Sequence, residues 1–224
     1  MIVRSFEEIW DISVQRKGSE KALNELLQFP KSKEEISDTP DDRFLAQMTK
    51  GIFQAGFNWQ VVENMWPGFE AAFEGFDIYK CRMLHDEDFD RLVSDTRIVR
   101  HGTKIRSVQQ NASFIFDIIA DHGSFGEFLA QWPSDNYIGL LEVLKKQGSR
   151  LGGYSGAYFL RFSGVDGFIL SQSVTNRLIA EGIVDKAPTS KKALAATQEA
   201  FNKWREESGR SLTEISRVLA MSTD

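Results

Sequence analysis

The sequence predicts an all-α protein of roughly ten or eleven short helices, arranged as two helical lobes. First, apolar residues recur at intervals of three and four through most of the chain. Second, no segment alternates convincingly with period two, apart from the short stretch GFIL at 167–170. Third, the 224 residues are 42% hydrophobic, which supplies the core of one large or two small domains.

Start and stop signals place the individual helices. Ser5 is expected to cap a helix in SFEEIWDISVQ, and Asp38 or Thr39 to cap the long periodic segment from 38 to 66. Because Gly51 and Gly56 interrupt that segment, two helices are expected to meet near Gly56.

The remaining helices follow in the same style. WPGFEAAFEGF is expected to form a short helix entered at Pro67, and the strongly amphipathic segment 102–123 to end at Gly123. The last two helices are expected to begin at Thr189 and Ser211. We expect one lobe from 1–40, 185–224 and parts of 41–80, and the other from 85–182.

Composition argues against several classes of protein. No apolar run is long enough to span a membrane, and the N-terminal residues lack the apolar region of a secretory signal. The single cysteine, Cys81, cannot form an internal disulfide, which favours a reducing cytoplasm. The three histidines have no ligand spacing, so we expect neither a metal nor another cofactor.

Charge distribution is more informative than the net charge of −5, which alone argues against a general nucleic-acid binder. Basic residues cluster in RIVRHGTKIR at 97–106 and in KKQGSR at 145–150. These clusters are compatible with one basic face on an otherwise acidic molecule.

A glycine-rich turn follows the second basic cluster, in GSRLGGYSGAYFL at 148–160. Glycine permits positive φ and close backbone approach, and a turn that leads into a helix presents free N–H groups to an anion. The turn is therefore either a phosphate-binding hairpin or a helix–helix connection without a ligand. In the first case the backbone-binding residues are Gly152, Gly153, Tyr154, Ser155 and Gly156.

Two blocks upstream carry a family resemblance: MTKGIFQAGFNWQVVENMWPGFEAAFEGFD at 48–77 and RLVSDTRIVRHGTKIRSVQQNA at 91–112. Over roughly residues 40–180 the chain resembles the DNA-3-methyladenine glycosylase I family, and the glycine-rich turn resembles the hairpin of helix-hairpin-helix DNA-binding domains. The resemblance rests on Phe53, Gln54, Ala55, Gly56, Trp59, Phe69, Phe73, Phe76, Asp77, Ile98, Arg100, His101, Lys104, Ile105, Asn111 and Ala112.

The resemblance implies an all-α helix-hairpin-helix glycosylase fold of two helical lobes with a cleft between them. It also implies double-stranded DNA with a damaged base as the partner, and site residues at matching positions. Trp59, Lys50 and Phe53 would line the base pocket, and Phe57 would fill the gap left by the flipped base. The DNA backbone would be bound by the hairpin together with Arg100, His101 and Lys104. The alternatives are ordinary core packing for Trp59 and Phe57, and a solvated surface turn for the basic residues.

The sequence departs from the family pattern at three places. The zinc-binding residues of the family are absent, so Phe201, Trp204, Ile215 and Leu219 are expected to hold the termini by packing. Lys50 stands where the family has a pocket glutamate. The superfamily aspartate is missing, and the nearest candidates are Ser173, which would otherwise cap a helix, and the loop residue Asp166.

Three functions remain open at the level of sequence. The first is a monofunctional DNA glycosylase of base excision repair that hydrolyses the N-glycosidic bond of alkylated purines such as 3-methyladenine. The second is a catalytically weak or inactive DNA-binding protein that senses damaged or modified bases. The third is an all-α scaffold without a DNA role. We expect a monomer that is cytoplasmic, associated with a bacterial nucleoid when it acts, and independent of membranes and metals.

Overall fold

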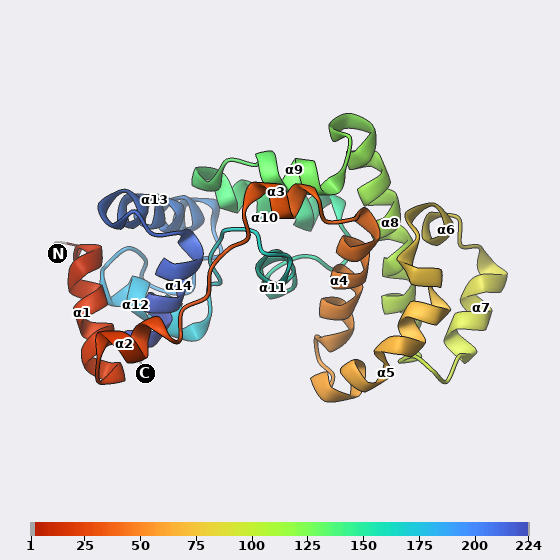
Figure 1. Cartoon of the computed structure of the whole chain (residues 1–224), viewed down its shortest axis with the longest axis horizontal. Coiled ribbons are helices and arrows are strands. Elements are labelled where there is room, and N and C mark those ends of the chain that lie inside the picture. The colour runs from red at the N-terminus through yellow and green to blue at the C-terminus, as the bar shows by residue number, and fades with distance from the viewer. Residues whose placement is uncertain (1–2, 224) are drawn as a thin grey trace. The chain divides into compact units, whose positions relative to one another are not determined.

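The computed structural model describes residues 3–223, and within them the chain is entirely helical, with fourteen α-helices, two short 3-10 helices and no strand. The all-α prediction is therefore confirmed. The chain divides into two compact units (Figure 1). The terminal unit contains the described residues of 1–31, 132–140 and 164–224, and the hairpin unit contains 32–131 and 141–163.

The terminal unit is built from both ends of the chain. Its helices are α1 (Phe6–Lys17), α2 (Glu20–Asn24), η2 (Ser134–Asn136), α12 (Gln172–Ala180), α13 (Lys191–Ser208) and α14 (Leu212–Met221). Helix α14 packs against α1, α12 and α13, and α1 runs beside it in Figure 1.

The core of the terminal unit is aromatic and aliphatic. Phe201 stacks on Phe168 with ring centroids 4.0 Å apart, and Trp204 meets Phe201 edge-on at 5.7 Å. Ile215 and Leu219 of α14 are fully buried, as are Phe201 and Trp204. The expectation that these four residues hold the termini by packing is confirmed.

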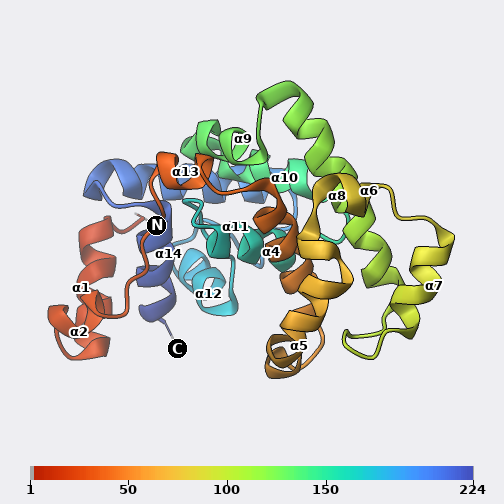
Figure 2. The same ribbon diagram turned by 45° about the vertical axis from the view of Figure 1, so that its right-hand side comes forward.

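The hairpin unit contains the longest helix, α8, around which its other elements gather. Its helices are α3 (Lys33–Ser37), α4 (Asp41–Gln54), α5 (Trp59–Ala72), η1 (Glu74–Phe76), α6 (Ile78–Arg82), α7 (Asp86–Ser94), α8 (Gly102–His122), α9 (Phe125–Gln131) and α11 (Tyr154–Ser163). Helix α10 (Tyr137–Gln147) begins in the terminal unit and ends in the hairpin unit. Helices α4, α6, α7 and α9 all pack against α8, and α11 lies along α4 (Figure 2).

Local capping explains several helix starts. The Ser5 and Ser211 hydroxyls each accept a backbone N–H in a reciprocal capping box, and α8 ends at Gly123, so these three predictions are confirmed. Two other predicted caps are wrong. Helix α13 is capped by Ser190 in place of Thr189, and α4 begins after Pro40 without a side-chain cap from Asp38 or Thr39.

Pro67 lies inside α5, and the expected short helix entered at Pro67 does not form. A proline in a helix removes one backbone hydrogen bond and usually breaks the helix. Here the aromatic residues on both sides of it, Trp66 and Phe69, are stacked at 5.4 Å, and Phe69 is fully buried. This packing holds one continuous helix from Trp59 to Ala72.

The structural division differs from the expected lobes in several ranges. Residues 32–40 lie in the hairpin unit, and residues 132–140 lie in the terminal unit. Residues 41–80 lie wholly in the hairpin unit, because α4 packs on α8 and α11. Residues 164–182 lie in the terminal unit, because α12 packs on α14. Amphipathic periodicity shows that a helix has a buried face, but it carries no information about which distant helix covers that face.

None of the helices in residues 3–223 combines the length and the apolar character needed to cross a bilayer. In the same residues, His, Cys, Asp and Glu side chains form no group of three or more that could hold a metal ion.

Candidate nucleic-acid interface

The glycine-rich turn joins α10 to α11 as a closely packed hairpin. Leu144 and Leu151 are buried at its base. A Cβ atom on Gly156 would lie 2.3 Å from the carbonyl oxygen of Leu151, so only glycine permits this approach. Gly153 has a φ of 61°, and the space beside its Cα is open. The turn thus combines a fixed base with an exposed tip.

Helix α8 holds Ser149, near the start of this turn, through two side chains. The Asn111 side chain, fully buried, accepts a hydrogen bond from the Ser149 N–H (2.7 Å) and donates one to the Ser149 carbonyl oxygen (3.1 Å). The Ser149 hydroxyl also bonds to Gln110 at 2.6 Å. Asn111 is therefore the residue that positions the hairpin on the long helix, a role that the sequence did not reveal because its partner lies 38 residues away.

Arg150, the next residue of the turn, is also held by α8. Its backbone adopts a φ of 59°, which is uncommon for a residue other than glycine. Its guanidinium donates to the Thr103 hydroxyl of α8 at 2.9 Å, and that hydroxyl lies one residue from Lys104 and two from His101. The two basic clusters of the sequence, which are far apart in the chain, therefore meet at the hairpin.

The exposed tip of the hairpin matches the geometry of an anion site. Gly152, Gly153 and Tyr154 are exposed, Ser155 is half-buried, and Tyr154 is the first residue of α11. The first N–H groups of a helix have no intrahelical acceptor and carry partial positive charge. Lys145 packs its aliphatic carbons against Gly152, which places a further cation at the turn.

The basic residues before α8 fall into two groups. Arg100 is exposed and His101 is half-buried, with its ring Nδ1 3.2 Å from the Thr103 hydroxyl. Lys104 is only 5% exposed, and its Nζ donates to the carbonyl oxygens of Ala55 (2.6 Å) and Phe53 (3.3 Å). Lys104 therefore caps the C-terminal end of α4, which differs from the phosphate contact expected of it.

The environment of Lys104 also changes its ionisation. Burial lowers the pKa of Lys104 below its usual range, and the charge of Arg150 lowers it further. The same ammonium group lies 4.5 Å from the ring centroid of Phe57. Lys104 thus holds the turn between α4 and α5 and the aromatic residue at its tip.

Phe57 and Trp59 both project from this turn. Phe57 is 40% exposed and meets the His101 ring edge-on, whereas Trp59 is 50% exposed and is the first residue of α5. Phe53, in contrast, is fully buried and packs edge-on against Phe69 at 4.8 Å. Phe53 therefore supports the surface from below, while Phe57 and Trp59 are available to a ligand.

Lys50 lies close to this surface and is paired. Its Nζ is 2.7 Å from a Glu63 carboxylate oxygen, and the other oxygen of Glu63 accepts a hydrogen bond from Gln54 at 3.0 Å. The ammonium group also lies 5.1 Å from the ring centroid of Trp66. Because residues three or four apart share a helix face, Trp59, Glu63 and Trp66 occupy one face of α5. Sequence reasoning missed Glu63, whose carboxylate lies beside Lys50.

Trp59 also contacts the helix that follows the hairpin. Its ring lies 6.5 Å from Tyr158 and 6.3 Å from Phe162, in both cases nearly perpendicular. Since Tyr158 is one turn beyond Tyr154, the aromatic group and the hairpin tip belong to one continuous surface of the hairpin unit. The sequence contained a signal for it, because Tyr154, Tyr158 and Phe162 are spaced by four residues.

The two candidate catalytic residues belong to the terminal unit. Asp166 accepts hydrogen bonds from the backbone N–H groups of Leu212 (3.2 Å) and Thr213 (2.9 Å), so its carboxylate caps α14. Ser173 lies inside α12, and the cap of that helix is Ser171. The expected capping position of Ser173 is therefore corrected by two residues.

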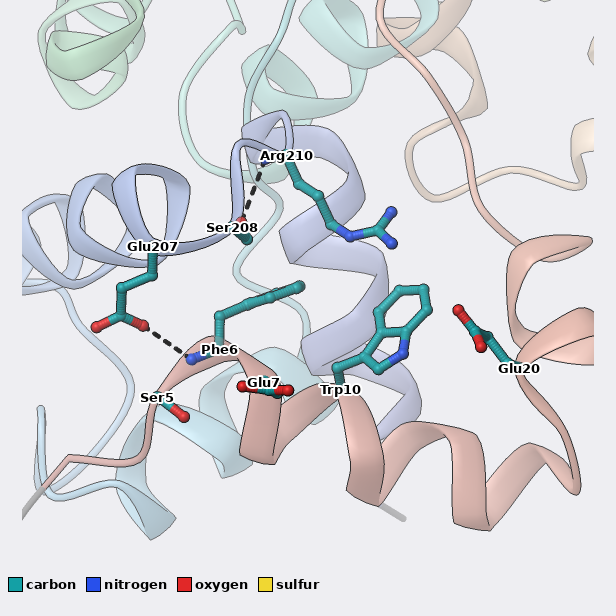
Figure 3. A pocket seen from close by; sticks show the side chains of 8 residues that line it. All are labelled: Ser5, Phe6, Glu7, Trp10, Glu20, Glu207, Ser208 and Arg210. Carbon is teal, nitrogen blue, oxygen red and sulfur yellow. Dashed lines mark hydrogen bonds between the residues drawn. The ribbon is translucent and has the colours of Figure 1, made fainter.

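A pocket of about 300 Å³ lies in the terminal unit and contains none of the expected site residues (Figure 3). Figure 3 shows Arg210 over the Trp10 ring, with the guanidinium carbon 4.0 Å from the ring centroid. The other lining side chains include the carboxylates Glu7, Glu20 and Glu207. This acidic lining disfavours a phosphate, so the basic hairpin is the better candidate for contact with nucleic acid.

Comparison with known proteins agrees with the resemblance seen in the sequence. A family model described as methyladenine glycosylase matches residues 36–142. The curated protein DNA-3-methyladenine glycosylase 1 of Escherichia coli (strain K12) is 33% identical over 84 residues, which are 38% of this chain and 44% of that relative. The chain thus spans less than half the length of this relative, and the family match ends before the hairpin that we expected it to include.

Solved structures show the same fold. A single-residue variant of 3-methyladenine DNA glycosylase I in complex with 3-methyladenine is 23% identical, with a TM-score of 0.51, over 57% of this chain and 80% of that chain. A structure of 3-methyladenine DNA glycosylase I from Staphylococcus aureus, described as the structural basis of 3-methyladenine recognition, is also 23% identical, with a TM-score of 0.50, over 56% and 77% of the two chains. At this identity the likeness concerns the fold alone.

Proposed function

From the match of residues 36–142 to the methyladenine glycosylase family, we propose that this protein is a DNA glycosylase of base excision repair. Its substrate would be an alkylated purine such as 3-methyladenine in double-stranded DNA. We also propose that the protein is a cytoplasmic monomer that acts on chromosomal DNA at a bacterial nucleoid. One observation carries the proposal of a glycosylase. The exposed Trp59 contacts the helix that follows the hairpin, so Trp59 and the expected phosphate-binding turn at Gly152–Gly156 share one surface of the hairpin unit.

In the proposed mechanism the hairpin binds the DNA backbone while the aromatic surface receives one base. The N–H groups at the tip of the hairpin bind a phosphate, with Lys145 and Arg150 adding positive charge. Phe57 enters the stack where the base has left, and Trp59 stacks on the flipped base. A purine nucleoside alkylated at a ring nitrogen, as 3-methyladenine is, carries positive charge, which favours an aromatic face.

The chemistry requires a water molecule to attack the sugar C1′ as the bond to the base breaks. The electron pair of that bond passes to the base, and the water loses a proton. A cationic base is already a good leaving group, because it becomes neutral when it takes the electron pair. Such a substrate needs little help from an acid at Asp166 or Ser173, and the structure uses the Asp166 carboxylate as a helix cap.

A second candidate function is favoured by this same use of Asp166. A protein with the hairpin and the aromatic surface, and no carboxylate committed to catalysis, would bind and sense a damaged or modified base without releasing it. The residue assignments for DNA binding are the same under both functions.

One experiment separates the two functions. The full-length protein is incubated with methylated genomic DNA, and released bases are identified by mass spectrometry. Release of a methylated purine supports the glycosylase. Salt-sensitive binding to the same DNA without release supports the sensor, whereas absence of both at about 50 mM salt contradicts a DNA function.

A further inference from the structure

Helix α11 carries an exposed row of aromatic side chains that the proposed base pocket does not require. Tyr154, Tyr158 and Phe162 are 57%, 36% and 49% exposed and are spaced by four residues, so they share one face of the helix. Tyr158 and Phe162 are stacked with ring centroids 5.9 Å apart, and Tyr154 lies 6.4 Å from Tyr158. We call these three residues the aromatic row.

The core of the unit does not account for this row. The opposite face of α11 supplies the buried residues Gly156, Ala157, Phe159 and Leu160, and α11 packs on α4. Phe159, for example, is 1% exposed and packs edge-on near Phe44. Three adjacent large aromatic side chains on the outer face form an apolar surface of the kind that marks a binding site.

Two features around the row indicate a nucleic-acid strand as its ligand. The row begins at Tyr154, the residue at the tip of the hairpin, so a strand whose phosphate sits at the hairpin has its next bases beside the row. The segment 141–163 also contains four basic residues and one acidic residue, a net charge of +3, in a chain whose net charge is −5. This local charge complements a phosphate backbone.

The Trp59 ring borders the aromatic row at a steep angle. Its ring plane is at 88° to that of Tyr158 and at 73° to that of Phe162. A flat base that stacks on the row therefore has the indole beside its edge, and a base that stacks on Trp59 has the row beside its own edge. Aromatic faces accept any nucleobase, because every base has a π-face.

We propose that the aromatic row of α11 is a stacking platform for unpaired bases next to the flipped one, so that the protein grips a locally opened stretch of a strand. The row extends the Trp59 surface from one base to a short run of bases. This inference rests on the proposed DNA-binding function, and it does not require that the protein cleave the glycosidic bond.

The test compares two strands of equal length and charge. One is a single-stranded oligothymidylate, and the other carries abasic tetrahydrofuran residues in place of its nucleosides. The full-length protein should bind the strand with bases about tenfold or more tightly, because stacking on aromatic side chains contributes strongly for each base. The ratio of the two affinities is the measured quantity, since both strands share the same phosphate contribution.

Tyr158→Leu and Phe162→Leu test the row directly, because leucine keeps apolar surface and helix propensity while removing the ring. Each variant should reduce the ratio severalfold, and the double variant should bring it close to one. Tyr79→Leu is the matched control. Tyr79 is 64% exposed on α6 of the same unit, meets Phe116 edge-on, and belongs to a helix that packs on α8, α4 and η1. This control should keep the ratio of the wild-type protein.

The outcomes separate this inference from the proposed function. If the ratio falls in the row variants, the platform is supported, whether or not the protein releases a methylated base. If the row variants keep the ratio of the wild-type protein, the platform is refuted, even where base release is observed. Light scattering on the same samples tests whether a second copy of the chain occupies this surface instead. A dimer that the row variants abolish would show that it does, and would overturn the inference.

Discussion

Lys50 of α4 and Glu63 of α5 form an ion pair, with 2.7 Å between the ammonium nitrogen and a carboxylate oxygen. Trp59 and Glu63 lie one turn apart on the same face of α5, so the pair borders the surface proposed to receive the base. Lys50 alone would repel a cationic base. Glu63 balances that charge and leaves this border close to neutral.

The first prediction follows from this balance. Glu63→Gln should lower the affinity for an alkylated, cationic purine, because Lys50 then lacks its partner, and Lys50→Gln should raise it. Both groups are partly exposed, so a change of about twofold to fivefold is expected for each. The measurement compares release or binding of a cationic methylated purine with that of a neutral purine in the same duplex.

The double variant of Lys50→Gln and Glu63→Gln is the control for this experiment. It removes both charges and should return the preference between the two purines to nearly that of the wild-type protein. Equal effects of all three variants on the cationic and the neutral purine would contradict a role of the pair in recognition.

The second prediction concerns the hairpin that is proposed to bind phosphate. Gly153→Asp should weaken binding to all DNA sequences alike, because it places a negative charge at the exposed tip where a phosphate is proposed to bind. Gly153→Asn is the matched comparison, since asparagine has nearly the same size and tolerates the φ of 61° without adding charge. Fluorescence anisotropy with several duplexes measures the effect.

A second control tests whether an added negative charge anywhere on the protein weakens DNA binding. Gly209 ends α13 with a φ of 66° and open space around it, so Gly209→Asp introduces the same charge and the same strain in the terminal unit. It should leave DNA affinity close to that of the wild-type protein. If both aspartate variants weaken binding equally, the effect belongs to net charge and the hairpin assignment fails.

The third prediction concerns Trp59 as the stacking residue. Trp59→Ala should abolish release of a methylated base and leave the unfolding midpoint nearly unchanged, because the side chain is half exposed. Trp59→Phe keeps an aromatic face and should retain part of the activity. Base release from methylated DNA and thermal unfolding are measured on the same preparations, and full activity of the alanine variant would refute the proposed pocket.

The fourth prediction concerns the clamp between Asn111 and Ser149. Asn111→Ala removes both hydrogen bonds and leaves the hairpin backbone unsatisfied, which should cost about 1–3 kcal/mol in the free energy of unfolding. Gln110→Ala, which loses one exposed hydrogen bond to the Ser149 hydroxyl, should cost much less. Urea unfolding of the two variants gives both values, and equal losses would show that the clamp is not specific to Asn111.

The fifth prediction is a pH dependence that arises from Cys81. Burial raises the pKa of the Cys81 thiol to about 12, so the native protein keeps the proton that the unfolded chain loses near pH 9. The thiol therefore contributes full stability below about pH 9, and this contribution falls as the pH rises towards 12, by at most about 1.4 kcal/mol per pH unit.

Cys81→Ala isolates this contribution. The variant should be less stable at pH 8, because it leaves space in the core, but its unfolding free energy should decline less steeply between pH 9 and 11 than that of the wild-type protein. Parallel declines in the two proteins would show that the thiol is not protected in the native state.

Sequence reasoning was most successful where the determining signal is local. The caps at Ser5 and Ser211 and the end of α8 at Gly123 depend on neighbours within one helical turn, and all three were predicted. Pro67 shows the opposite case. A local rule placed a helix start there, and stacking of Trp66 on Phe69 overrode it.

Side-chain roles that depend on distant partners were not predicted. Lys104 occupies a basic cluster and was expected to bind phosphate, but the carbonyl groups at the end of α4 take its hydrogen bonds. Asn111 belongs to the sequence block that carries the family resemblance, but nothing near it in the sequence indicates a bond to Ser149. The aromatic row was visible as a spacing of four residues, but core packing gives the same spacing, and only exposure distinguishes the two.

The terminal unit has a consequence for the order of events during synthesis. The Ser13 hydroxyl of α1 donates to the carbonyl oxygen of Val218 in α14 at 3.0 Å, and the two residues are separated by 205 positions in the sequence. Helix α1 therefore leaves the ribosome long before α14 has been synthesised. Until then the apolar face of α1 is exposed to solvent or bound by a chaperone. Contacts of such long range slow folding, so the terminal unit closes only after α14 has been synthesised.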